Sequence, residues 1–170
     1  MKRRLSMLAA AALAAVALTV VLAATGGAQT PGGPTLTFLD DTSHGTQVFV
    51  DSAPKSPARN PQSPRFRLSA GDTLYVHSPI LDHAGGARIG TAYSEFTVVS
   101  GNSFANAVFR GHGAFKLRDG QIVADGVVRP ASATNTVAVV GGTGAYQGAR
   151  GSLSFTQVSN GSQDTFHLLP

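Results

Sequence analysis

Residues 139–151 read Val-Val-Gly-Gly-Thr-Gly-Ala-Tyr-Gln-Gly-Ala-Arg-Gly. The stretch joins the β-branched end of one strand-like run to a second run at residues 152–158. Glycine adopts backbone angles that a side chain forbids, so a glycine-dense segment lets the chain reverse sharply between packed strands. We therefore predict a structural turn at these glycines. Its motif residues are Gly141, Gly142, Thr143, Gly144, Tyr146 and Arg150.

A nucleotide site is the competing interpretation, because glycine-rich loops that follow strands also bind phosphates. A phosphate loop needs a helix N-terminus behind it, and a P-loop needs Gly-Lys-Ser or Gly-Lys-Thr. Here residues 152–158 alternate like a strand, and no lysine follows the glycines. The pattern favours the turn.

The chain from Thr35 onward consists of short β-branched and aromatic runs separated by turn residues, which predicts an all-β fold. Their spacing favours an antiparallel barrel or a sandwich. The prolines between residues 53 and 64 predict a surface loop, with a lid over one barrel mouth as the alternative. Asn160-Gly161 predicts a tight hairpin turn. The expected strands lie near 35–40, 46–51, 73–78, 87–99, 103–117, 121–129, 136–140, 152–158 and 165–169.

The first 28 residues have the pattern of a secretion signal. A basic start at residues 2–4 precedes an apolar run over residues 8–24, and small residues at 26–28 suit cleavage. We predict a signal peptide over 1–28 that is cleaved after Ala28, a linker over 29–34, one barrel domain over 35–170, and a secreted product. An uncleaved membrane anchor is the alternative.

Charge and residue content exclude several classes of site. Removal of the three basic residues at positions 2–4 leaves ten basic and nine acidic residues, so we expect no nucleic-acid partner, and no membrane association after cleavage. The sequence has no cysteine, and its five histidines lack the spacing of metal ligands. No Gly-x-Ser-x-Gly elbow is present. We predict neither a metal nor a cofactor.

Alternation along residues 103–117 indicates which side chains share a face. Small residues beside large ones on that face suit either the taper of a filled barrel or a ligand cavity. One face carries Ala105, Ala107, Phe109, Gly111, Gly113, Phe115 and Leu117. The candidate ligand contacts are Phe38, Tyr75, His77, Tyr93, Phe109 and Phe115.

Asp40 is the candidate catalytic residue. It is in phase with Leu36 and Phe38, so it projects into the interior if they do, and burial perturbs the proton affinity of a carboxyl group. The alternative is that Asp40 ends its strand and caps the following turn with Asp41 and Thr42.

Arg150 and Tyr146 have structural rather than chemical interpretations. A buried arginine must be paired, so we predict a salt bridge from Arg150 to Asp125 or Glu95. We expect Tyr146 to pack the turn against the barrel.

Four groups of residues carry a family resemblance: the motif at 141–151, the run Leu36-Thr37-Phe38-Leu39-Asp40, the triplet at 90–92, and Phe109-x-Gly111-x-Gly113-x-Phe115 with residues 119–122. Together they resemble the superfamily that joins plant dirigent proteins and allene oxide cyclases. The resemblance implies an eight-stranded antiparallel β-barrel of calycin type with an apolar central cavity, commonly trimeric. It also places Asp40 at the strand-one aspartate that is proposed to handle protons in dirigent proteins.

Three functions follow as alternatives. The first is a cofactor-free guide or cyclase that orients an apolar, reactive small molecule, since orientation alone lowers a barrier by roughly 7–11 kcal/mol. The second is a secreted carrier of a hydrophobic ligand, and the third is a barrel filled by its own side chains. Convergent ionisable groups in the cavity favour chemistry, whereas a wholly apolar lining favours carriage.

Overall fold

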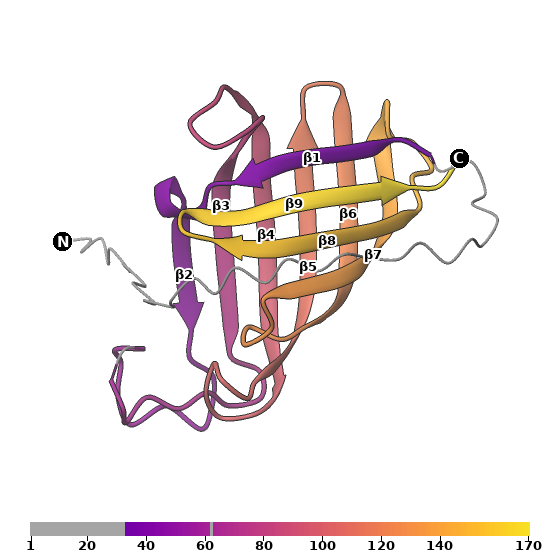
Figure 1. Cartoon of the computed structure of the whole chain (residues 1–170). Helices are drawn as coiled ribbons and strands as arrows, with labels where there is room; N and C mark the ends of the chain where they lie inside the picture. Colours follow the sequence, from indigo (N-terminus) through magenta and orange to yellow (C-terminus); the bar gives the residue numbers. More distant parts are fainter. Residues whose placement is uncertain (1–32, 62) are drawn as a thin grey trace, which may run out of the picture. The chain divides into compact units, whose positions relative to one another are not determined.

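A computed structural model of the protein describes residues 33–61 and 63–170 (Figure 1). The predicted signal peptide lies outside the described residues, as does the predicted linker except for its last two residues. Within the described ranges, no helix has the length and apolarity needed to cross a membrane.

The described chain forms one antiparallel sheet whose neighbouring strands follow the order β1-β9-β8-β7-β6-β5-β4-β3-β2. β1 also pairs with β3, through Leu39 with Leu81 and Asp40 with Ile80, so the sheet closes on itself. The elements are β1 (Thr35–Asp40), a 3-10 turn (Thr42–His44), β2 (Thr46–Val50), β3 (Thr73–Leu81), β4 (Arg88–Ser100), β5 (Val108–Leu117), β6 (Gly120–Val128), β7 (Thr134–Gly144), β8 (Gly151–Val158) and β9 (Gly161–Leu168).

β1 and β2 act as one bent strand, because both pair with β3 and only the short 3-10 turn separates them. Counted in this way, the closed barrel has eight strands, which confirms the predicted all-β, eight-stranded antiparallel barrel. Closure removes the exposed edges that an open sheet presents.

Side-chain alternation fills the barrel as the sequence predicts for β5. Phe109, Gly111, Gly113 and Phe115 are buried, whereas the side chains between them point outward. The strand starts later than predicted, at Val108. Before it, the Asn106 side-chain oxygen accepts hydrogen bonds from the backbone amides of residues 102 and 103, and such a local bond competes with strand pairing.

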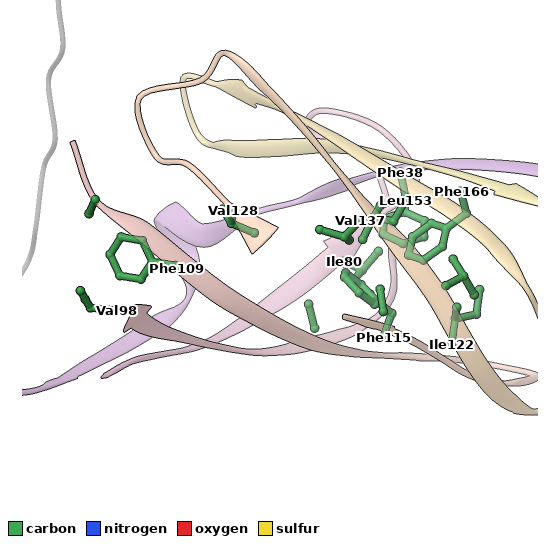
Figure 2. Close-up of a cluster of buried hydrophobic side chains, with 14 of the residues drawn as sticks. Phe38, Ile80, Val98, Phe109, Phe115, Ile122, Val128, Val137, Leu153 and Phe166 are labelled. Carbon is green, nitrogen blue, oxygen red and sulfur yellow. The ribbon is translucent and has the colours of Figure 1, made fainter. Parts of the chain in front are cut away.

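The core is aromatic at its centre. The rings of Phe38, Phe115 and Phe166 contact one another with centroids 5.0–6.0 Å apart. Figure 2 shows them grouped with Ile122, while Phe109 lies apart from this group. Full burial of one such side chain contributes roughly 1.5–3 kcal/mol, so this group is a major source of stability.

The described residues of the proline-rich segment 53–64 form a loop in which none is buried, as the prolines predict, and the buried side chains that pack onto the barrel come only after it. Phe66 and Leu68 are buried, and the Phe66 ring contacts Phe49 and Phe104 at centroid distances of 5.5 and 6.4 Å. The buried Asp72 carboxylate pins the loop base by accepting hydrogen bonds from the amides of residues 52 and 69, at 2.7 and 2.8 Å.

Gly141, Gly142 and Gly144 lie on a strand, so the predicted turn at these glycines is wrong, and the actual turn follows several residues later. β7 continues through Gly144, and the chain reverses over residues 145–150. Two glycines still serve the turn. A side chain at Gly142 would collide with the carbonyl oxygen of Tyr146, and Gly144 has a φ of +61°. Tyr146 packs against the core, as expected.

Arg150 forms neither of the predicted salt bridges. Its guanidinium is exposed and donates to the carbonyl oxygens of Ala149 and Val140, at 3.0 and 3.3 Å. Asp125 pairs instead with Arg110, at 3.2 Å. The prediction failed because an exposed arginine needs no carboxylate partner. Arg150 holds the β7–β8 turn through backbone carbonyls.

Candidate functional site

Two carboxyl groups meet inside the apolar barrel. In the β1–β9 ladder, Asp40 lies opposite Ser162 and Phe38 lies opposite Asp164. Residues directly opposite each other share a face, so the inward direction of Phe38 and Asp40 makes Ser162 and Asp164 point inward too. Asp40 and Asp164 are both buried.

The close approach of the β8–β9 hairpin to β1 fixes this arrangement. A Cβ atom at Gly161 would collide with the carbonyl oxygen of Asp40, so only glycine allows this contact. The hairpin turn lies at residues 159–160, as the Asn-Gly pair predicts. Ser162 and Asp164 follow this turn directly and are therefore held beside the end of β1.

Each carboxyl group has a serine partner. The Ser78 hydroxyl on β3 donates to Asp40 Oδ1, and the Ser162 hydroxyl donates to Asp164 Oδ1 at 2.7 Å. No buried side-chain nitrogen or oxygen in the described residues lacks a hydrogen-bond partner. The pair is therefore a satisfied polar cluster within an apolar core, as burial of polar groups requires.

Burial raises the pKa of Asp40 to about 6, the Ser78 hydrogen bond opposes this shift, and the charge of Asp41 adds to it. Burial also raises the pKa of Asp164 well above its usual value; the nearby Asp40 carboxylate raises it further, and Ser162 opposes the shift. Asp40 therefore ionises first, and its charge then favours the protonated form of the more deeply buried Asp164. Two environments that separate a pair of carboxyl pKa values supply an acid and a base.

A small cavity of about 50 Å³ adjoins the pair. One water needs at least about 10–15 Å³ by this measure, so the free space holds a few waters. Gly111 and Gly113 on β5 line the cavity together with half-buried Phe96 and Phe155. Neighbouring side chains occupy the space beside these glycines, because a Cβ atom at Gly113 would meet the Phe115 ring at 2.9 Å. The lumen is thus neither solidly filled nor wide, and a larger ligand needs these two rings to move.

Asp41, rather than Asp40, serves the turn after β1. Its carboxylate accepts a hydrogen bond from Ser43 Oγ at 2.5 Å and lies 2.7 Å from His44 Nδ1. Burial alone would raise the pKa of Asp41, but the hydrogen bonds from Ser43 and His44 and the His44 charge lower it overall. This division of roles leaves Asp40 directed into the barrel.

The predicted ligand contacts divide between the two faces of the sheet. Phe38, Phe109 and Phe115 are buried inside, and Phe115 lines the cavity. The expectation that Tyr75 and His77 lie in the interior is wrong, because β3 buries Ser78 and Ile80, and its odd-numbered residues therefore point outward.

Tyr93 also lies on the outer face. It stands between the inward Ala92 and Ser94 on β4 and is exposed, so it does not line the lumen. The ring of His77 stacks on Tyr93 across the β3–β4 ladder. The three polar aromatic residues therefore gather outside the barrel, on the face opposite the carboxyl pair.

Sequence reasoning missed Asp164, Ser162 and Ser78. The predicted last strand began at Thr165, whereas β9 begins at Gly161. The signal was present, because Asp164 alternates with Phe166 and Leu168 directly after the hairpin turn. Across residues 33–61 and 63–170, no group of three or more His, Asp or Glu side chains is placed to hold a metal ion.

The chain thus forms a closed antiparallel barrel with a carboxyl pair in its lumen. Comparison with known families identifies the same class of barrel. Residues 58–167 match the family described as "Allene oxide cyclase barrel like domain". This match spans more than half of the chain, so the chain belongs to that family. A search of curated proteins finds no match.

Solved structures with the same fold support this assignment. "Pyocyanin demethylase" is 17% identical, with a TM-score of 0.60, covering 79% of this chain and 99% of its own. The pterocarpan synthase dirigent protein PsPTS1 is 20% identical, with a TM-score of 0.57, covering 79% and 94%. The Diels Alderase AbmU from Streptomyces koyangensis is 14% identical, with a TM-score of 0.53, covering 84% and 72%. At these identities the likeness shows the fold alone, and it is the family match that confirms the resemblance to the superfamily of dirigent proteins and allene oxide cyclases.

Proposed function

We propose that the protein binds an apolar small molecule in its lumen and steers the cyclisation or stereoselective coupling of that molecule without a cofactor. The observation that carries the proposal is the buried pair of Asp40 and Asp164, whose pKa values differ and are both raised. Proteins of the same fold with names that include dirigent protein and Diels Alderase support a role in guiding bond formation.

The pair supplies an acid and a base for a redox-neutral cyclisation. The protonated Asp164 donates its proton to a substrate oxygen that gains negative charge as the ring closes. The ionised Asp40 accepts the proton that a substrate carbon or hydroxyl group releases. One proton arrives and one leaves, so the product is an isomer, and proton exchange between the two carboxyl groups restores the starting state. General acid–base catalysis of this kind contributes about 10²–10⁴-fold.

The apolar wall supplies orientation. The Phe115 ring and the side chains of Ala124 and Val137 line the cavity, and they contact a ligand without fixing it by hydrogen bonds. The carboxyl pair and its serine partners then orient the ligand, because a few polar groups in an apolar pocket determine the pose of a ligand. The half-buried Phe96 and Phe155 turn aside to admit the ligand.

A carrier of a hydrophobic ligand is the alternative function. The free volume of the lumen is small, so a carrier needs the Phe96 and Phe155 rings to move aside, whereas the barrel counts as filled if they stay in place. Two convergent, ionisable side chains favour chemistry, since carriage alone gains nothing from buried carboxyl groups. Burial of these groups costs stability, which a purely structural barrel would not need to bear.

The experiment is mass spectrometry of molecules extracted from the purified protein by denaturing solvent. We expect one apolar, unsaturated compound, and we expect Ala124→Phe, which fills the lumen, to lose it. Ala138→Phe is the matched control, because Ala138 lies on the adjacent strand β7 and points outward. No bound molecule, or equal retention by both variants, would contradict binding in the lumen.

Turnover is tested with the compound extracted from purified Asp40→Asn, which should retain unconverted substrate, by adding that compound to fresh protein. The wild type should convert it, while Asp40→Asn and Asp164→Asn should bind it and convert it at least about 10²-fold more slowly. If the compound binds to all three proteins and none of them converts it, the protein is a carrier.

We also propose that the protein acts outside the cell after cleavage at Ala28, as a homo-oligomer. The basic and apolar pattern of residues 2–24 supports secretion, and the family resemblance supports a trimer.

A further inference from the structure

The outer face of the barrel carries a second hollow beside the exposed Tyr75 and Tyr93. It has a volume of about 400 Å³, against about 50 Å³ for the lumen cavity. Ligand pockets typically measure about 300–1,000 Å³, so this hollow has the size of a ligand site as it stands. It lies over β2, β3, β4 and β5, which are neighbours in the sheet (Figure 1).

Polar aromatic side chains form the wall of this hollow. The rings of His77 and Tyr93 stack with centroids 4.8 Å apart and planes 13° from parallel. Tyr75 lies two residues from His77 on the same face of β3, opposite Val48 on β2. Tyr75, Tyr93 and Val48 are 45%, 49% and 52% exposed, so these side chains offer large uncovered surfaces within the described chain.

A short side chain opens the floor of the hollow. Ala114 on β5 lies directly opposite Tyr93, and it lines the hollow where a longer residue would fill it. The stacked pair therefore stands beside a recess. Flat aromatic molecules stack on such rings with centroids about 4.5–7 Å apart.

The charge of the hollow is negative. Glu95 lies opposite Tyr75 on one side and His112 on the other, and it contacts the Thr97 hydroxyl at 3.4 Å. Within the described residues, Glu95 forms no salt bridge. The neighbouring Asp125 differs, because Arg110 pairs with it at 3.2 Å. No lysine or arginine lines the hollow, so the Glu95 charge is not compensated there.

We propose that this outer hollow binds a flat aromatic cation. The faces of Tyr75 and Tyr93 carry the negative part of the ring quadrupole, which attracts a cation, and the Glu95 carboxylate adds a full negative charge beside them. A ligand ring lies against Tyr93, and its positive charge lies near Glu95. This site lies on the outer face and takes no part in the proposed cyclisation, although Ser94 and His112 line both it and the lumen cavity.

The experiment compares two probes of nearly equal shape, the cation N-methylacridinium and neutral acridine, by titration calorimetry near neutral pH. We expect the wild type to bind the cation about threefold to fivefold more tightly, the size of effect that an exposed charge pair produces. Glu95→Gln should reduce this preference to the part that the tyrosine rings supply, while retaining both probes. Tyr93→Ala should weaken both. Val127→Ala, at an exposed position on β6, is the control and should bind as the wild type does.

Several results would overturn the proposal. They are absence of cation binding, equal affinity of the wild type for both probes, and binding that neither Glu95→Gln nor Tyr93→Ala alters, which would place the probe elsewhere. A further contradicting result would come from light scattering on the same samples, which measures the oligomeric mass. If Tyr93→Ala reduces the oligomeric mass, the face is a contact between copies of the chain and not a ligand site.

Discussion

At the residue scale, the account depends on two carboxyl groups that are buried among apolar side chains. Asp40 was predictable, because its phase with Leu36 and Phe38 is visible in the sequence. Asp164 was not predicted, because its strand was taken to begin at Thr165, four residues too late. Their pKa values could not be predicted from the sequence. They depend on burial and on the pairing of β1 with β9, two strands that are far apart along the chain.

The raised pKa values predict a specific dependence of stability on pH. A carboxyl group with a higher pKa in the folded state binds more protons there than in the unfolded state, so stability falls as pH rises between the two values. For Asp40 the fall lies between pH 3.8 and about 6, and it amounts to about 3 kcal/mol in the free energy of unfolding.

Asp40→Asn should therefore be more stable than the wild type above about pH 6, with most of that gain absent in acid. Urea unfolding across the pH range measures it. Asp119→Asn, at an exposed position in the β5–β6 turn, is the control and should follow the wild type. If the Asp40→Asn and wild-type curves run parallel at every pH, the Asp40 carboxyl is not perturbed.

At the scale of elements, two neighbouring glycines of the motif have different roles. A Cβ atom at Gly142 would collide with the carbonyl oxygens of Tyr146 and Gln121, whereas a Cβ atom at Gly141 meets nothing within 4 Å. Gly142→Ala should lower the free energy of unfolding by about 1–3 kcal/mol, the cost of inserting atoms into packed structure. Gly141→Ala should be nearly neutral. Thermal unfolding measures both, and equal losses would mean that the glycines serve flexibility and not close approach.

Alternation made the strand faces predictable in part. It correctly placed Phe109, Gly111, Gly113 and Phe115 inside, because small and aromatic residues alternate with charged ones on β5. It failed for Tyr75 and His77, since β3 has polar or aromatic residues on both faces and the sequence does not say which face is covered. The packing that follows the proline-rich loop was missed for a related reason, because Phe66 and Leu68 contact β2 and the β4–β5 loop, which are distant in the sequence.

At the scale of the whole molecule, strand spacing alone favoured a barrel or a sandwich equally. The decisive pairing is the short contact of β1 with β3, which joins residues about forty positions apart. No local pattern encodes such closure, and the family resemblance supplied it. The barrel in turn creates two environments, a lumen with a carboxyl pair and an outer hollow with polar aromatic residues.

The proposed export has a direct consequence for the mature chain. Protein recovered from culture medium should have the intact mass of residues 29–170, and light scattering should give three times that mass. Retention of residues 1–28 in a membrane fraction would identify an anchor instead. A single-chain mass in solution would contradict the trimer.

The central claim is that Asp40 and Asp164 share a lumen in which the pKa of both carboxyl groups is raised and Asp164 keeps its proton after Asp40 has ionised. Carbon-detected NMR of the side-chain carboxyl groups, titrated from acid to alkaline pH, tests it most directly. The account predicts that Asp40 titrates with a pKa of about 6 and that Asp164 is still protonated when Asp40 has ionised. Titration of both groups near 3.8, the ordinary value of an aspartate, would contradict it.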